Sequence, residues 1–243
     1  MKFEKTEVWG FKHVIRGMRN PLESWDKSDS KDKCVCSEDG SLHDEPCGYD
    51  ACCLGCYFEH KFVIGENDLK LAQSLIKAGS EHRKFLRQIF VSVDITAPLY
   101  WWKEFDTYKI GTVSNSTSTM HKLASTPITI DCFEMDDFSE IIDNYRISKS
   151  WQNITTYLEQ LRQRYNETKD KRYWKELIRL LPESWLQKRT ITMNYENILN
   201  MYQQRKHHKL TEWSESFINW VRTLPYAQEF LFLDELEEKK NDK

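Results

Sequence analysis

Apolar residues recur along this chain with the spacing of helices and, in a few short stretches, with the alternation of strands. Residues 65–79 carry the clearest helical pattern. Their apolar stripe consists of Leu69, Ala72, Leu75 and Ile76. Asn67 or Asp68 can cap the start of this helix, and Gly79 suits the left-handed position at its end.

The same patterns predict the other elements. Helices are expected at 136–144, 151–165, 170–181, 194–205, 210–222 and from 225 to about 236. Strands are expected at 7–16, 88–94, 128–133 and 187–193. Short strands interleaved with long helices are typical of the α+β class. We therefore expect one α+β domain over residues 1–243, with a flexible tail at 237–243.

The stretch 97–122 joins an aromatic helix to a run of polar side chains. Trp101, Phe105 and Tyr108 recur at i, i+4 and i+7, which puts them on one helical face. The polar run after Gly111 consists of Thr112, Ser114, Asn115, Ser116, Thr117, Ser118 and Thr119. Such a run can offer many hydrogen bonds to a small polar ligand. A core helix followed by an ordinary polar loop explains the same pattern.

Composition narrows the functional classes. The 243 residues include 35 basic and 38 acidic side chains, for a net charge of −3. This balance argues against binding to nucleic acid, and no apolar run is long enough to cross a membrane. The first residues lack the apolar core of a signal peptide, so we expect a cytoplasmic protein. Nine tryptophans favour a core of large aromatics or flat surfaces for a ligand.

Six of the seven cysteines fall within a short segment, which we treat as a Cys-rich insertion over 34–60. They are Cys34, Cys36, Cys47, Cys52, Cys53 and Cys56, with His43 among them and His60 just beyond. In a cytoplasmic chain this density favours a metal, and four thiolates, or three and an imidazole, suit tetrahedral zinc. The candidate zinc ligands are Cys34, Cys36, Cys53 and Cys56, with Cys52 an alternative to Cys53. Disulfides, free thiols in a loop and an iron–sulfur cluster are the other readings.

Two stretches resemble signature sequences of the flavin-dependent thymidylate synthase family. In the first, Thr107-Tyr108-Lys109 falls on the family's Arg-His-Arg, and Thr117 falls on a serine eight residues beyond its second arginine. Glu104 falls on a family glutamine, Asn115 on a glutamate, and Thr119-Met120 on Arg-Tyr.

The second stretch runs from Leu181-Pro182 to Arg205, and its matching residues are Thr192, Asn194, Glu196, Asn200 and Arg205. The resemblance covers roughly residues 60–225 with gaps, and the Cys-rich insertion lies outside it. It implies an antiparallel sheet with long helices. Family members convert dUMP to dTMP with FAD, NADPH and methylene-tetrahydrofolate, in homotetramers whose sites lie between subunits. This chain is then expected to form a tetramer, to bind FAD and a pyrimidine nucleotide, and to act as a methyltransferase.

The resemblance also assigns roles to residues. Contacts with FAD are expected from Thr107, Tyr108, Lys109, Asn115, Asn194 and Asn200. Contacts with the nucleotide are expected from Glu104, Lys109, Ser116, Thr117 and Arg205. Thr117, Ser118 and Arg205 form the expected catalytic group, in which the hydroxyls orient the nucleotide and Arg205, with Lys109, anchors its phosphate.

Several cationic family positions have changed in this chain. Thr107, Tyr108 and Thr119 are uncharged, and Glu196 reverses the charge. Because a charge-assisted hydrogen bond contributes ~1.5–3 kcal/mol, these losses would weaken nucleotide and cofactor binding by orders of magnitude unless other cations replace them. Candidates for that replacement are Lys103, Arg189, Lys206, His207 and His208.

Three functional readings follow. The first is a divergent flavin-dependent enzyme that transfers a one-carbon unit to dUMP. The second is a catalytically decayed relative that binds a ligand or a partner protein and carries a zinc loop. The third is a redox role for the cysteines beside a flavin.

Overall fold

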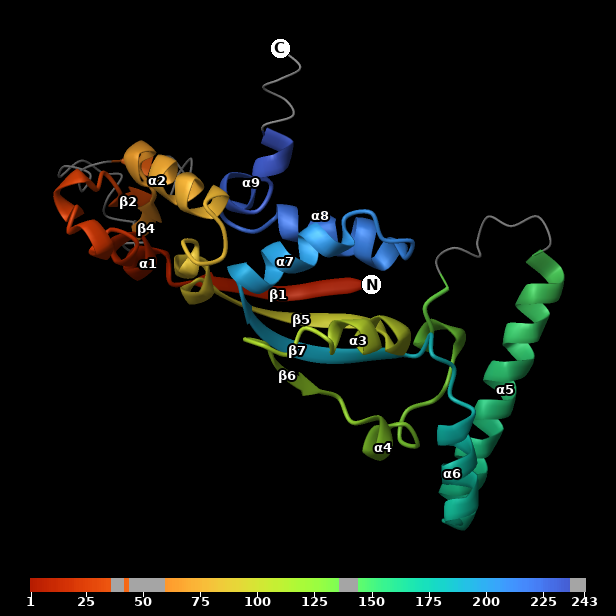
Figure 1. Ribbon diagram of the computed structural model, residues 1–243. Helices are drawn as coiled ribbons and strands as arrows, with labels where there is room; N and C mark the ends of the chain where they lie inside the picture. The colour runs from red at the N-terminus through yellow and green to blue at the C-terminus, as the bar shows by residue number, and fades with distance from the viewer. Residues whose placement is uncertain (36–41, 44–59, 136–143, 237–243) are drawn as a thin grey trace, which may run out of the picture. The chain divides into compact units, whose positions relative to one another are not determined.

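The computed structural model describes residues 1–35, 42–43, 60–135 and 144–236 (Figure 1). For Cys34, Val35, His43, His60 and 144–148 it describes the backbone alone. Three of the predicted zinc ligands, Cys36, Cys53 and Cys56, lie outside the described residues. So do the tail at 237–243 and all but the last residue of the helix expected at 136–144.

The helices and strands alternate along the chain. The strands are β1 (Lys2–Trp9), β2 (Lys31–Val35), β3 (Leu42–His43), β4 (His60–Val63), β5 (Phe90–Pro98), β6 (Val113–Ser116) and β7 (Leu186–Asn194). The α-helices are α1 (Phe11–Gly17), α2 (Glu66–Lys77), α3 (Leu99–Phe105), α4 (Thr119–Lys122), α5 (Asn144–Thr168), α6 (Lys171–Arg179), α7 (Tyr195–Arg205), α8 (Ile218–Arg222) and α9 (Ala227–Phe230). Short 3-10 helices lie at Asn20–Leu22, Trp25–Lys27, Lys84–Gln88 and Ile130–Cys132, and a π-helix lies at Glu212–Phe217. No helix among the described residues is long and apolar enough to cross a lipid bilayer.

The chain divides into two compact units. The first unit consists of Met1–Glu7, Ser92–Met193 and Arg205–Trp220. The second unit consists of Val8–Val91, Asn194–Gln204 and Val221–Lys243.

The first unit is built around a four-stranded sheet with the strand order β1-β5-β7-β6 (Figure 1). Along β5, buried and less buried residues alternate, because successive side chains of a strand point to opposite faces. Strand β6 pairs with β7 in the antiparallel sense, from Val113 opposite Thr192 to Ser116 opposite Arg189. The expected α+β class, with an antiparallel sheet and long helices, is confirmed.

A second, smaller core of the first unit forms where α5 and α6 lie side by side as a hairpin (Figure 1). Its buried members are Leu123, Ile128, Phe133, Leu158, Leu161 and Leu177. The carboxylate of Glu159 ties this hairpin to the preceding loop, since it accepts hydrogen bonds from the Arg162 guanidinium at 2.6 and 2.7 Å and from the Ile128 amide at 2.8 Å.

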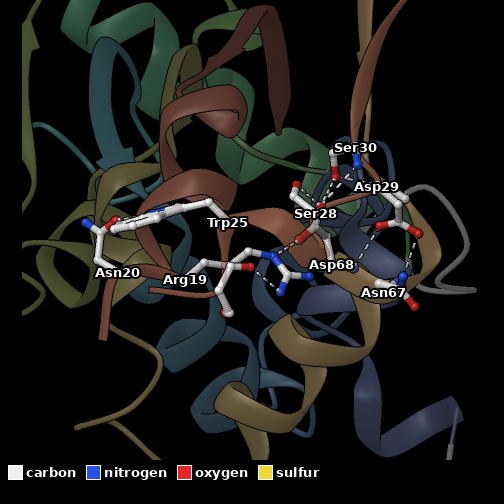
Figure 2. A network of polar contacts seen from close by, with 10 residues as sticks. Arg19, Asn20, Trp25, Ser28, Asp29, Ser30, Asn67 and Asp68 are labelled. Carbon is white, nitrogen blue, oxygen red and sulfur yellow. Dashed lines mark hydrogen bonds and ion pairs between the residues drawn. The ribbon is translucent and has the colours of Figure 1, made fainter. Parts of the chain in front are cut away.

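The second unit contains a three-stranded sheet with the order β3-β2-β4. Helix α2 follows β4 directly, and its first amides are capped from a distance in sequence. The Asp29 carboxylate accepts hydrogen bonds from the amides of Asn67 at 2.9 Å and Asp68 at 3.2 Å (Figure 2). The expected helix is therefore confirmed, but neither Asn67 nor Asp68 caps it.

Three local expectations were wrong. The strand expected at 7–16 ends at Trp9, because Gly10 turns the chain with φ of 107° and helix α1 begins at Phe11. The strand expected at 128–133 is a 3-10 turn, held by the Cys132 amide on the Thr129 carbonyl at 3.1 Å. The helix expected from 225 to about 236 is interrupted, because α9 ends at Phe230 and neither Leu231 nor Phe232 is helical. In the polar run after Gly111, Ser114, Asn115 and Ser116 form β6 together with Val113, a strand that the sequence did not predict.

Candidate functional site

The aromatic helix α3 is fastened to the sheet of the first unit. Its first amides, those of Leu99 and Tyr100, donate to the carbonyls of Trp185 and Glu183, each at 3.1 Å. On its buried face, the Trp102 indole donates to the Gln187 carbonyl of β7 at 3.0 Å. This helix therefore holds the side chains at its end, from residue 104 to residue 108, in a set position against the sheet.

At the end of α3, Glu104 forms an ion pair with Arg205, with Oε2 and Nη1 2.8 Å apart. Nε of Arg205 donates to the Tyr108 hydroxyl at 2.8 Å, and its guanidinium lies 5.1 Å from the centre of the Trp213 ring. The imidazole of His208 is 3.5 Å from the same Glu104 carboxylate. Three of the predicted site residues, Glu104, Tyr108 and Arg205, therefore meet, but they meet as a cluster in which this chain's own carboxylate neutralises the arginine.

A second arginine of this unit is neutralised in the same way. Arg189 of β7 pairs with Asp106 at 2.7 Å, and its guanidinium stacks 4.2 Å from the centre of the Trp102 ring. Lys103 pairs with Glu183 at 2.6 Å. Two of the cations expected to replace the lost family cations are thus already engaged with carboxylates of the same unit.

A cavity of about 400 Å³ opens beside the end of the polar run. Its hydroxyl-bearing wall contains Thr96, Thr117, Ser118, Thr119 and Thr126, and Lys122, Asp131 and the Trp185 ring lie around it. This volume falls within the range that small-molecule sites occupy, roughly 300–1,000 Å³. The lining thus combines hydroxyls, one ammonium group and a tryptophan with the carboxylates of Asp131 and Glu134, and Glu134 is paired with the N-terminal ammonium at 2.9 Å. Such a mixture suits a polar ligand that carries a flat ring.

The wall of this cavity is held by β7. The Thr117 amide and hydroxyl both donate to the Lys188 carbonyl, at 2.9 and 3.2 Å. The Gln187 side-chain amide donates to the Thr117 carbonyl at 2.9 Å, and Ser118 accepts from the His121 amide at 3.2 Å. Of the predicted catalytic residues, Thr117 and Ser118 therefore line this cavity, whereas Arg205 belongs to the Glu104 cluster.

The other predicted residues of the polar run have different surroundings. Lys109 lines a smaller cavity of about 250 Å³ together with Asp106, Thr112 and Ser114. Thr107 closes the end of α3, since its hydroxyl donates to the Glu104 carbonyl at 2.7 Å. Asn115 and Ser116 are exposed on the edge strand β6.

Comparison with solved structures shows which fold this is. Two crystal structures of the flavin-dependent thymidylate synthase ThyX from Helicobacter pylori, each with FAD and dUMP, match 96% of this chain. One has a TM-score of 0.62 at 16% identity and is covered over 99% of its own chain. The other has a TM-score of 0.63 at 17% identity and is covered over 98%.

The chain has the fold of a flavin-dependent thymidylate synthase. The expected resemblance is therefore confirmed, and at this identity it concerns the fold. No protein-family model and no curated protein sequence matches the chain.

Of the second signature stretch, Asn194, Glu196 and Asn200 lie in the second unit. The Asn194 side-chain oxygen accepts from the Asn197 amide at 3.0 Å and so caps α7. Glu196 pairs with Arg83 at 3.0 Å, and the same guanidinium donates to the Asn200 side chain at 3.1 Å. The negative charge of Glu196, which the sequence resemblance places at a cationic family position, is thus matched by an arginine of the same unit.

Sequence reasoning missed Lys122 and Trp185 as cavity residues. Trp185 precedes the predicted strand at 187–193, and Lys122 follows the polar run, so only their position in the fold brings them together. Among the residues whose side chains the structure describes, no cluster of three His, Cys, Asp or Glu side chains is arranged to hold a metal ion.

Proposed function

We propose that this protein binds a pyrimidine deoxynucleotide in the cavity beside Thr117 and Ser118, uses FAD, and transfers a one-carbon unit to dUMP. One observation carries the proposal. The chain matches nearly the whole length of ThyX structures that contain FAD and dUMP, and the hydroxyl run predicted to contact the nucleotide lines a cavity of ligand size. The likeness in fold supports the reaction class, and the cavity supports the substrate class.

The cavity offers chemistry that matches a nucleotide monophosphate. Lys122 is exposed on its wall and supplies a cation, and Ser118 and Thr119 supply hydroxyl groups that can donate to phosphate or uracil oxygens. Trp185 supplies an aromatic surface for a flat base. Arg205 is absent from this wall.

The residues present also fit part of FAD. Lys109 is exposed and shares its small cavity with Ser114, so an ammonium group and a hydroxyl can donate to a phosphate oxygen of the cofactor there. The Asp106 carboxylate of the same cavity is paired with Arg189, and the Thr112 hydroxyl donates to the Tyr108 carbonyl. When bound, the flavin supplies the hydride that completes the methyl group. The protein's own residues orient the nucleotide through their hydroxyl groups and Lys122.

The proposal is tested by titrating the purified protein with FAD, followed by visible absorbance, and with dUMP, followed by calorimetry. Lys122→Ala is expected to weaken dUMP binding by about tenfold or more, because a charge-assisted hydrogen bond contributes ~1.5–3 kcal/mol. Lys109→Ala is expected to weaken FAD binding on the same grounds. Lys171→Ala, an exposed lysine at the start of α6, is the matched control and should change neither.

A protein that takes up neither FAD nor dUMP would overturn this proposal. Equal dUMP affinity in the Lys122→Ala and Lys171→Ala variants would show that the nucleotide does not bind in this cavity.

The ion pairs of the first unit favour a second candidate function. Arg205, Arg189 and Lys103 are each paired with a carboxylate of their own unit, so a diphosphate would have to compete with that carboxylate for each of them. We therefore propose, as the alternative, a catalytically decayed relative that binds a ligand or a partner protein and carries zinc in its Cys-rich insertion. Binding of dUMP without formation of dTMP in the presence of FAD, NADPH and methylene-tetrahydrofolate would favour it. Formation of dTMP would eliminate it.

A further inference from the structure

Charge is distributed unevenly along this chain. Residues 144–179, which form the α5–α6 hairpin, include nine basic and four acidic side chains (Figure 1). All other residues together include 26 basic and 34 acidic side chains. The hairpin is therefore the basic part of an otherwise acidic chain, and the net charge of −3 for the whole chain does not describe it.

The length of the hairpin makes this local excess important. Helix α5 has 25 residues and is ~37 Å long, at a rise of ~1.5 Å per residue. The Debye length at physiological salt is ~8 Å, so a phosphate group bound on the hairpin responds mainly to the charges close to it. The argument from net charge against nucleic acid therefore applies to the chain as a whole and does not exclude binding at the hairpin.

The four acidic residues of the hairpin each pair with one of its arginines. These pairs are Glu159–Arg162, Glu167–Arg164, Asp170–Arg172 and Glu176–Arg179. Lys169 and Lys175 are exposed, and neither forms an ion pair with a residue that the structure describes. The hairpin therefore presents uncompensated lysines to solvent, as a surface that contacts phosphate groups requires.

A hollow of about 640 Å³ lies between the two helices of the hairpin. Its lining includes Tyr157, Gln160 and Arg164 from α5, and Tyr173 from α6. Tyr157 is 50% exposed, and the exposed Gln160 side chain forms no hydrogen bond with a residue that the structure describes. Two aromatic rings and an amide that can both donate and accept thus line one open hollow.

The hollow also contains the carboxylate of Glu167, which pairs with Arg164 at 3.5 Å. Both side chains are more than half exposed, at 63% and 65%. An exposed ion pair of this kind is weak, because water screens the two charges. A phosphate group can therefore replace Glu167 as the partner of Arg164.

We propose that this hollow binds a base of a single-stranded nucleic acid whose phosphates lie along the basic hairpin. Base faces stack on tyrosine rings whatever the sequence, and the Gln160 amide can donate to and accept from the edge of a base. A duplex hides the faces of its bases within its own stack, so the hollow selects single strands. RNA and DNA share this chemistry.

Fluorescence anisotropy of a short, labelled, single-stranded oligonucleotide tests the proposal on the full-length protein. We expect binding that weakens as the salt concentration rises, and weaker binding when the same oligonucleotide is in a duplex. Tyr157→Ala should weaken binding by about tenfold, because stacking on one base is lost. Arg164→Ala should reduce the slope of log affinity against log salt by about 1, because one phosphate contact is lost.

Two control variants lie outside the hairpin. Trp9→Ala changes an exposed aromatic residue and Arg16→Ala changes an exposed arginine, and both should bind the oligonucleotide as the wild type does. Circular dichroism checks that every variant is folded. Ribose and deoxyribose oligonucleotides are titrated in parallel, and binding of either one supports the proposal.

Three results would overturn the proposal. Binding to phosphatidylserine vesicles without binding to either oligonucleotide assigns the basic hairpin to a membrane surface. Equal affinity for single strand and duplex excludes a base in the hollow. Loss of binding in Lys122→Ala, with full binding in folded Tyr157→Ala, assigns the oligonucleotide to the cavity beside Thr117. Tyr157 and Arg164 take no part in the nucleotide proposal, so failure to bind dUMP and failure to bind the oligonucleotide are separate results.

Discussion

Asp68 is a buried carboxylate whose loss should be costly. Its side chain is fully buried, and its partner Arg19 is only 5% exposed. Asp68→Asn keeps the shape of the side chain but leaves the Arg19 guanidinium without a compensating charge. Removal of one partner from a buried ion pair typically costs ~3–5 kcal/mol, so we expect the free energy of unfolding to fall by about that amount.

The hydrogen bonds around Asp68 set the size and the pH dependence of this effect. Burial raises the pKa of Asp68, but hydrogen bonds from Ser30, Ser28 and Arg19 outweigh it and hold the pKa below its ordinary value. A carboxylate with a lowered pKa stabilises the folded state above its unfolded pKa, about 3.9, and loses that contribution as the pH falls further. The difference between wild type and Asp68→Asn should therefore be full at neutral pH and shrink below about pH 4.

Urea unfolding followed by circular dichroism measures this difference at several pH values. Asp26→Asn, at an exposed aspartate in the turn Trp25–Lys27, is the control and should change stability by less than ~0.5 kcal/mol. Replacing Arg19 by methionine in the Asp68→Asn background should recover part of the loss, because the unpaired charge is then removed. A loss below ~1 kcal/mol at neutral pH, or one that Arg19→Met does not reduce, would refute the reasoning.

Two further predictions concern charged pairs of the first unit. Glu159→Gln should lower stability by ~1–3 kcal/mol at pH 7, because hydrogen bonds from Arg162 hold the pKa of Glu159 at about 2. That contribution is lost as the pH falls from about 4 to about 2, so urea unfolding should show the gap closing; a constant gap would contradict it. Glu104→Gln removes the charge that neutralises Arg205, and calorimetry should then show roughly tenfold tighter binding of inorganic phosphate. Unchanged affinity in a folded variant would show that Glu104 does not limit Arg205.

Local periodicity was enough to predict the elements whose burial follows from neighbours in sequence. Helix α2 buries Ala72 and Ile76 four residues apart, and β5 buries Val91 and Val93 two residues apart. Each pattern identifies the buried face of one helix or one strand. The order of these elements along the chain was therefore enough to predict the α+β class. The arrangement of these elements in space was predicted from the resemblance to flavin-dependent thymidylate synthases. The periodicity of apolar residues carries no information about that arrangement.

Interactions between residues far apart in the sequence could not be predicted from local periodicity. The cap of α2 comes from Asp29, which precedes Asn67 by 38 residues. The polar run around Ser114 looked like a loop because an edge strand with two exposed faces has no hydrophobic alternation to reveal it. The resemblance assigned both Glu104 and Arg205 to contacts with a ligand. Only the structure shows that these two residues form an ion pair with each other.

The charge changes in the two signature stretches have a common structural result. The sequence resemblance places Glu104 at a family glutamine and Glu196 at a family cation. In the structure Glu104 pairs with Arg205, and Glu196 pairs with Arg83. In each case the carboxylate lies 2.8–3.0 Å from an arginine of its own unit. The charge of that arginine is therefore balanced without a bound anion. Arg205 and Arg83 are thus each engaged with a carboxylate of this chain, and any anion that bound at either arginine would have to compete with that carboxylate.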